Sequence, residues 1–159
     1  MSITVQYSFN SDLALPQLAF EISRRLGCVL EPDAGDPECL FSGGLFGMEL
    51  TLWTHTLVND RDLNFEDYRY QIENKTWAGS PLRPIQVEVI ALTAFFLHDM
   101  SLAIHRGMLS YDVQTLLARY EERGDVWFDL VGGKRVTYPD HLVDIKARIH
   151  DPAGAGLIA

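Results

Sequence analysis

The sequence has little cysteine, few basic residues and no long uninterrupted apolar run, and each shortage argues against a class of protein. Its 159 residues include two cysteines, too few for the disulfide framework of a small secreted scaffold. Lys and Arg number 13 against 22 Asp and Glu, a formal charge of -9, which argues against binding nucleic acid or an anionic membrane. Two acids, a glutamine and a histidine interrupt the most apolar stretch, 85–104, which therefore predicts a buried helix.

Signatures of targeting, metal binding and catalysis are also missing. The first residues lack a basic segment followed by an apolar one, so we expect no secretory signal and a cytoplasmic protein. Cys28 and Cys39 have no common metal spacing, and His98 and His105 lack the intervening pattern of zinc helices. No Gly-x-Ser-x-Gly motif or phosphate-binding loop with its lysine is present. We therefore expect no cofactor and a binding protein rather than an enzyme.

The negative charge is concentrated in the first half of the chain. Residues 1–80 contain twelve acidic and five basic residues, whereas 81–159 contain ten and eight. Two segments, 31–38 and 59–67, hold four acids each and are rich in turn-forming residues, which predicts exposed loops. Such loops either serve solubility or form an electrostatic surface for a basic protein partner.

Aromatic residues follow the second acidic segment closely. Tyrosine and tryptophan flanked by carboxylates suit a protein-binding surface, because the rings anchor the partner and the charges orient it. The alternative is that the tyrosines face the core. The predicted partner-binding residues are Glu31, Asp33, Asp36, Glu38, Asp60, Asp62, Glu66, Asp67, Tyr68, Tyr70 and Trp77.

Hydrophobic periodicity predicts an α+β fold, with a mixed α/β layer as the runner-up. We expect a single domain over 1–150, built as a mostly antiparallel sheet packed by a long central helix and two or three further helices, followed by a flexible tail over 151–159. Strands are expected at 3–9, 28–30, 45–57, 68–73 and 108–111, with a turn or bulge at Gly43-Gly44, and a glycine-turn hairpin at 126–138. Helices are expected at 15–26, capped from 10–12, then at 85–105, at 112–124 and from 139 to about 149.

Three stretches, 45–50, 65–70 and 112–120, together with the acidic segment between the first two, give this chain a resemblance to a known group. It resembles the small acidic immunity proteins of bacterial polymorphic and contact-dependent toxin systems. The resemblance implies a protein that binds and neutralises the C-terminal domain of a cognate toxin, a basic nuclease, and it supplies no site residues. The alternatives are a small regulatory or ligand-binding module and a small enzyme that uses His55 or His98. The oligomeric state stays open.

Overall fold

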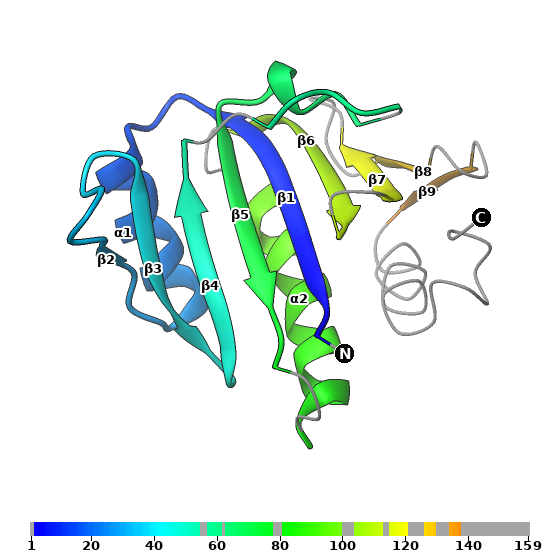
Figure 1. Cartoon of the computed structure of the whole chain (residues 1–159). Helices are drawn as coiled ribbons and strands as arrows, with labels where there is room; N and C mark the ends of the chain where they lie inside the picture. The colour runs from blue at the N-terminus through cyan, green and yellow to red at the C-terminus, as the bar shows by residue number, and fades with distance from the viewer. Residues whose placement is uncertain are drawn as a thin grey trace.

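One antiparallel sheet runs through the part of the chain that the computed structural model describes. This part comprises residues 2–54, 57–61, 63–77, 81–99, 104–112, 115–120, 126–129 and 134–137. Within it, nine strands lie in the order β2-β3-β4-β5-β1-β6-β7-β8-β9. Figure 1 shows α1 behind β3 and β4, and α2 behind β5 and β1, so both helices cover the same face of the sheet. The α+β class and the mostly antiparallel sheet are confirmed.

Two helices interrupt the run of strands along the described chain. In sequence order the elements are β1 (Thr4–Ser11), α1 (Leu15–Leu26), β2 (Glu31–Pro32), β3 (Leu40–Leu45), β4 (Met48–Trp53), the 3-10 turn η1 (Phe65–Asp67), β5 (Tyr70–Lys75), α2 (Arg83–Asp99), β6 (Ile104–Tyr111), β7 (Thr115–Tyr120), β8 (Val126–Asp129) and β9 (Lys134–Thr137). In these residues no helix is long and apolar enough to cross a membrane.

The first strand of the chain occupies the centre of the sheet. β1 pairs antiparallel with β5 on one side and with β6 on the other, although both partners follow far later in the sequence. Its residues Val5, Tyr7 and Phe9 point toward the helices and are at most 1% exposed. They pack in one apolar cluster with side chains of α1, α2 and the neighbouring strands, so the main core lies between the sheet and the helices.

The helix α1 forms as its periodicity predicts. Its apolar residues recur every three or four positions and are buried against the sheet, and Gly27 ends it in the left-handed conformation with a φ of 68°. The prediction that a residue of 10–12 caps this helix is wrong, because the N-cap is Ala14. The backbone N–H of Ala14 donates a hydrogen bond to the side-chain oxygen of Gln17.

Two other helix predictions need correction. The helix expected at 85–105 is α2, which spans Arg83–Asp99, since the chain is already a strand from Ile104. The helix expected at 112–124 is wrong, because Thr115–Tyr120 is β7. Of the further helices expected, the described residues contain α1, while 139–149 and the tail 151–159 lie outside the described part.

The strand predicted over 45–57 is confirmed in part as β4, Met48–Trp53, which forms a hairpin with β3. Its turn lies at Phe46 and Gly47, both with positive φ, as tight hairpin turns require. Gly43, which the sequence suggested as a turn or bulge, is a paired residue inside β3. The segment 28–30 is not a strand, and β2 follows it at Glu31–Pro32. The hairpin predicted near the end of the described chain is confirmed as β8 and β9, which pair antiparallel.

Candidate functional site

Both acidic loops lie at the same end of the sheet. Leu40 at the start of β3 pairs with Trp53 at the end of β4, and the Thr54 N–H donates to the Cys39 carbonyl at 3.0 Å. The β2–β3 connection therefore meets the segment that follows β4, and Figure 1 shows both at the upper end of the sheet. We call this surface the acidic end. It comprises Asp33, Asp36, Glu38, Asp60, Glu66 and Asp67.

The acidic end has carboxylates available to a partner. All six side chains are exposed except that of Asp33, which is half-buried. Within the described residues the ion pairs join Glu21 to Arg24 and Arg25 on α1, so no basic residue in this part of the chain forms a salt bridge with the carboxylates of the acidic end. Glu31 is exposed on β2 at the sheet edge, and Asp62 lies outside the described residues.

Hydrogen bonds hold the two loops in shape. The Asp33 carboxylate accepts the backbone N–H of Gly35 at 2.8 Å and that of Asp36 at 3.2 Å, a local turn of the kind that aspartate favours. In the second loop the Asn59 side chain accepts the Glu66 N–H at 2.9 Å, and the Glu66 carboxylate accepts the Asn59 N–H at 3.4 Å. The carboxylates are thus displayed on preformed turns.

The second loop is also anchored to the sheet. Leu63, Phe65 and Tyr68 form an apolar cluster with Met108 of β6 and Leu116 of β7. In addition, the Asn10 side chain donates to the Asp67 carbonyl and accepts the Arg69 N–H, both at 2.9 Å. The loop therefore has fixed contacts with β1, β6 and β7.

Of the three aromatic residues predicted to contact the partner, two are buried and the third lies near the opposite end of the sheet. Tyr68 is 5% exposed in the cluster that anchors the loop, and Tyr70 is 1% exposed in the main core, where its hydroxyl donates to the Leu13 carbonyl at 2.7 Å. Strand alternation turns Tyr70 toward the helices together with Ile72, which corrects the expectation that these tyrosines are presented to a partner. Trp77 is 61% exposed, but it follows the end of β5 that lies farthest from the acidic end.

The sheet face that points away from the helices carries a row of polar side chains. Because directly paired residues share a face, the strand registers align Ser42, Thr51, Glu73, Gln6 and Ser110 across β3, β4, β5, β1 and β6. The Gln6 amide donates to the Glu73 carboxylate at 3.1 Å and accepts the Ser110 hydroxyl at 3.4 Å. We call this surface the polar face.

Part of the polar face is buried. Gln6, Ser8, Gln71 and Ser110 are at most 3% exposed, while Thr51, Trp53 and Glu73 beside them are half-buried. Sequence reasoning missed this surface, because polar residues that alternate with apolar ones in a strand normally face solvent. Their composition gave one signal: the polar positions of β1 are uncharged, unlike the acids and bases that usually cover an exposed sheet face.

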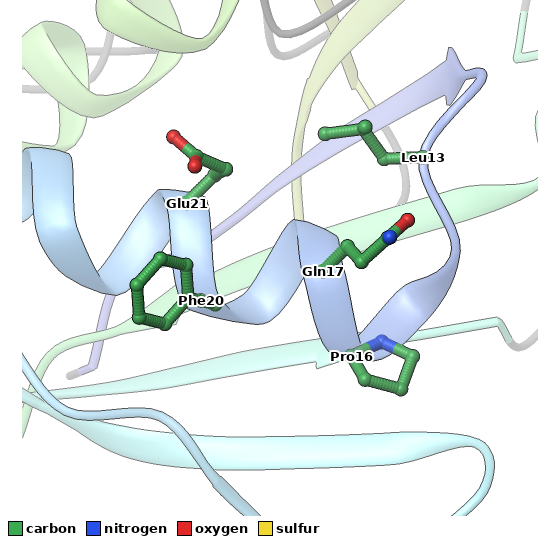
Figure 2. Close-up of a pocket in the computed structure, with 5 residues that line it drawn as sticks. All are labelled: Leu13, Pro16, Gln17, Phe20 and Glu21. Carbon is green, nitrogen blue, oxygen red and sulfur yellow. The ribbon is translucent and has the colours of Figure 1, made fainter.

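A hollow of about 390 Å³ runs along α1. Figure 2 shows its lining, with Leu13 from the segment before the helix and the other side chains from the helix itself. Phe20 is 65% exposed beside it, and the Glu21 carboxylate accepts a hydrogen bond from Arg24 at 2.8 Å. The hollow is mostly apolar and brings together no group of catalytic residues.

The groups with reactive chemistry are dispersed in the described residues. No three His, Cys, Asp or Glu side chains lie close enough together there to hold a metal ion. Burial raises the pKa of the Tyr7 hydroxyl well above its ordinary value, and burial also raises the pKa of the Cys28 thiol. His55, His141 and His150 lie outside the described residues, and only the backbone of His98 and His105 is described.

Comparisons with protein-family models, with curated proteins and with solved structures find no match to this chain. Its function is therefore inferred from the acidic end and the polar face.

Proposed function

We propose that this chain is an immunity protein that works in the cytoplasm, binding a basic bacterial toxin domain through the acidic end and neutralising it. One observation carries the proposal: the two acidic segments, 31–38 and 59–67, lie at the same end of the sheet, the first beside β3 and the second against β1, β6 and β7. A nuclease must bind phosphates with basic residues. An acidic protein surface offers the same charge and can occupy that basic site.

The order within the loops supports this role. Association costs free energy when loops and side chains must be immobilised, and preformed loops reduce that cost. The turn at Asp33 and the reciprocal bonds between Asn59 and Glu66 hold the acidic segments before any partner arrives. The concentration of one charge sign at one end also accelerates association with an oppositely charged protein.

The first test uses the neighbouring gene product. The proposal expects a large secreted protein to be encoded immediately upstream, and the purified C-terminal domain of that protein is the probe. It should form a stable complex with this chain, and the association rate should fall by about tenfold or more between low and high salt, because screening removes the electrostatic steering. Absence of a complex, or a rate that is independent of salt, would contradict the proposal.

A matched pair of double variants localises the interface. Asp36→Lys/Asp60→Lys reverses one exposed carboxylate in each acidic loop, and it should lower the association rate by about tenfold or more. Glu49→Lys/Glu88→Lys makes the same change in net charge at exposed positions on β4 and α2, and it should retain most of the rate. Equal effects of the two variants on the rate, measured by stopped flow, would show that net charge rather than the acidic end governs binding.

The polar face favours a second candidate, a small ligand-binding module. Four uncharged polar side chains of this face are at most 3% exposed, and buried polar groups need hydrogen-bond partners, which a bound polar molecule can supply. This candidate predicts binding of a small polar molecule without any protein partner.

A further inference from the structure

Two buried polar side chains on the polar face lack hydrogen-bond partners. Ser8 of β1 and Gln71 of β5 are directly paired across the two strands, and they are 2% and 3% exposed. Within the described part of the chain, neither the Ser8 hydroxyl oxygen nor the Gln71 amide nitrogen has a hydrogen-bond partner. Leaving such groups desolvated and unpaired is costly, and buried polar groups are almost always satisfied by protein, water or ligand.

The neighbours of this pair differ on its two sides. On the β6 side, Ser8 pairs with Met108, which belongs to the apolar cluster that anchors the second acidic loop. On the β4 side, Gln71 pairs with Trp53, and the next same-face position along β5 is Glu73. Trp53 and Glu73 are half-buried, in contrast to the fully buried Ser8 and Gln71. The pair therefore has an indole on β4 and a carboxylate on β5 as neighbours that are partly open to solvent.

The chemistry of these groups restricts what can bind. The unpaired Gln71 amide nitrogen is a hydrogen-bond donor. A cationic group such as an ammonium also has only donors, so it cannot form a hydrogen bond with this nitrogen. An anionic group would accept from Gln71 but would meet the Glu73 carboxylate one same-face position along β5, in a chain of net charge -9. A neutral amide satisfies both requirements, because its carbonyl accepts from Gln71 and Ser8 while its N–H donates to Glu73. Same-face positions on a strand are about 6.6 Å apart, so Gln71 and Glu73 can hydrogen-bond to two different atoms of one amide group.

We infer that Ser8, Gln71 and Glu73, flanked by Trp53, form a binding site for a neutral amide edge. The amide belongs either to a small planar lactam, which the Trp53 ring can stack against, or to a glutamine, asparagine or backbone amide of a protein partner. This site uses none of the carboxylates of the acidic end and does not depend on the toxin partner.

The test follows the side-chain amide signals of Gln71 by nitrogen–proton NMR in the wild-type protein. The signals are assigned with Gln71→Met, and the exposed amide of Gln17 on α1 serves as an internal control. The protein is titrated with uracil, a planar lactam, and separately with N-acetylglutamine methylamide, a protein-like amide. A saturable shift of the Gln71 signals without a comparable shift at Gln17 is expected with at least one probe. Ser8→Ala should weaken the apparent affinity by about tenfold, as expected for one lost hydrogen bond.

Each outcome of the titration decides the inference. A shift with uracil identifies the site as one for a free lactam, and a shift with the acetylglutamine probe alone identifies it as a contact for a protein amide. The inference is overturned if neither probe shifts Gln71, if Gln17 shifts equally, or if Ser8→Ala leaves the affinity unchanged. The titration of the wild-type protein requires no variant to fold.

Discussion

Gly43 and Gly44 are neighbours in β3, yet the space around them differs sharply. A Cβ added to Gly43 would overlap the backbone carbonyl oxygen of Val29, with the carbonyl carbon at 3.1 Å. A Cβ added to Gly44 would meet its nearest atom, the Met48 carbonyl oxygen, at 3.7 Å, an ordinary contact. The chain leading into β2 therefore crosses directly over Gly43, and glycine is required there by close approach rather than by a turn.

This contrast gives a prediction at the scale of one residue. Gly43→Ala should lower the free energy of unfolding by about 1–3 kcal/mol, because a backbone atom cannot move aside as a flexible side chain can. Gly44→Ala should change it by less than about 1 kcal/mol, since alanine fits the strand at that position. Urea unfolding of the two variants measures both values. Equal decreases in the free energy of unfolding for the two variants would show that the Val29 backbone is not in close contact with Gly43 in solution.

At the scale of elements, Asn10 ties the end of β1 to the end of the second acidic loop through two backbone hydrogen bonds. Asn10→Ala should lower the free energy of unfolding by about 1–3 kcal/mol, because both bonds to the loop backbone are lost. Asn10→Asp should lose less, since an aspartate oxygen can still accept the Arg69 N–H. Faster hydrogen exchange at Arg69 in the alanine variant, but not in the aspartate variant, would confirm the tie. Unchanged exchange in both variants would contradict it.

The sequence predicted a helix where the structure has β7, and this error shows a limit of predicting elements from hydrophobic periodicity. Leu116 and Leu117 are adjacent, and each belongs to a different apolar cluster because the two faces of β7 are both covered. A strand buried on both faces and an amphipathic helix each place apolar residues next to one another, so periodicity cannot separate them. Asp112, interpreted from the sequence as a helix cap, has a φ of 51° and lies in the connection from β6 to β7. By contrast, α1 buries one face only, and its pattern was unambiguous.

The candidate site was predictable in its charge but not in its arrangement. The acidic segments follow from composition alone, whereas their placement at the same end of the sheet depends on the pairing of β3 with β4 and of β5 with β1. Tyr70 was misplaced because its alternation with Ile72 fits either face of a strand until the helices are positioned. The polar face depends on which strands become neighbours, and sequence patterns do not determine that order.

At the scale of the whole molecule, one end of the sheet carries a cluster of acidic residues, and the opposite end exposes the apolar side chains of Phe46 and Trp77. Repulsion among the carboxylates opposes folding, and salt screens it. Raising the salt concentration from about 10 mM to about 150 mM, over which the Debye length falls from roughly 30 Å to roughly 8 Å, should therefore stabilise the protein by about 0.5–1 kcal/mol.

Neutralising the acidic end should remove most of that gain. The variant Asp36→Asn/Glu38→Gln/Asp60→Asn deletes three charges there, and thermal unfolding at the two salt concentrations measures the difference. Glu49→Gln, at an exposed position on β4, is the control and should keep the salt response of the wild type. A response that stays the same in the triple variant would mean that the repulsion is spread over the whole surface.

The central position of β1 also has a consequence for synthesis. β1 leaves the ribosome before its two neighbours, β5 and β6, which end at Lys75 and Tyr111. At about 5–20 residues per second, translation needs roughly 5–20 s after β1 has been made before β6 is complete. Before β5 is complete, neither hydrogen-bonding edge of β1 can be paired as in the finished protein, and until β6 is complete the edge that faces β6 cannot be paired in that way. The nascent chain is therefore exposed to chaperones, and to other unfinished chains, at a strand that is almost fully buried in the mature protein.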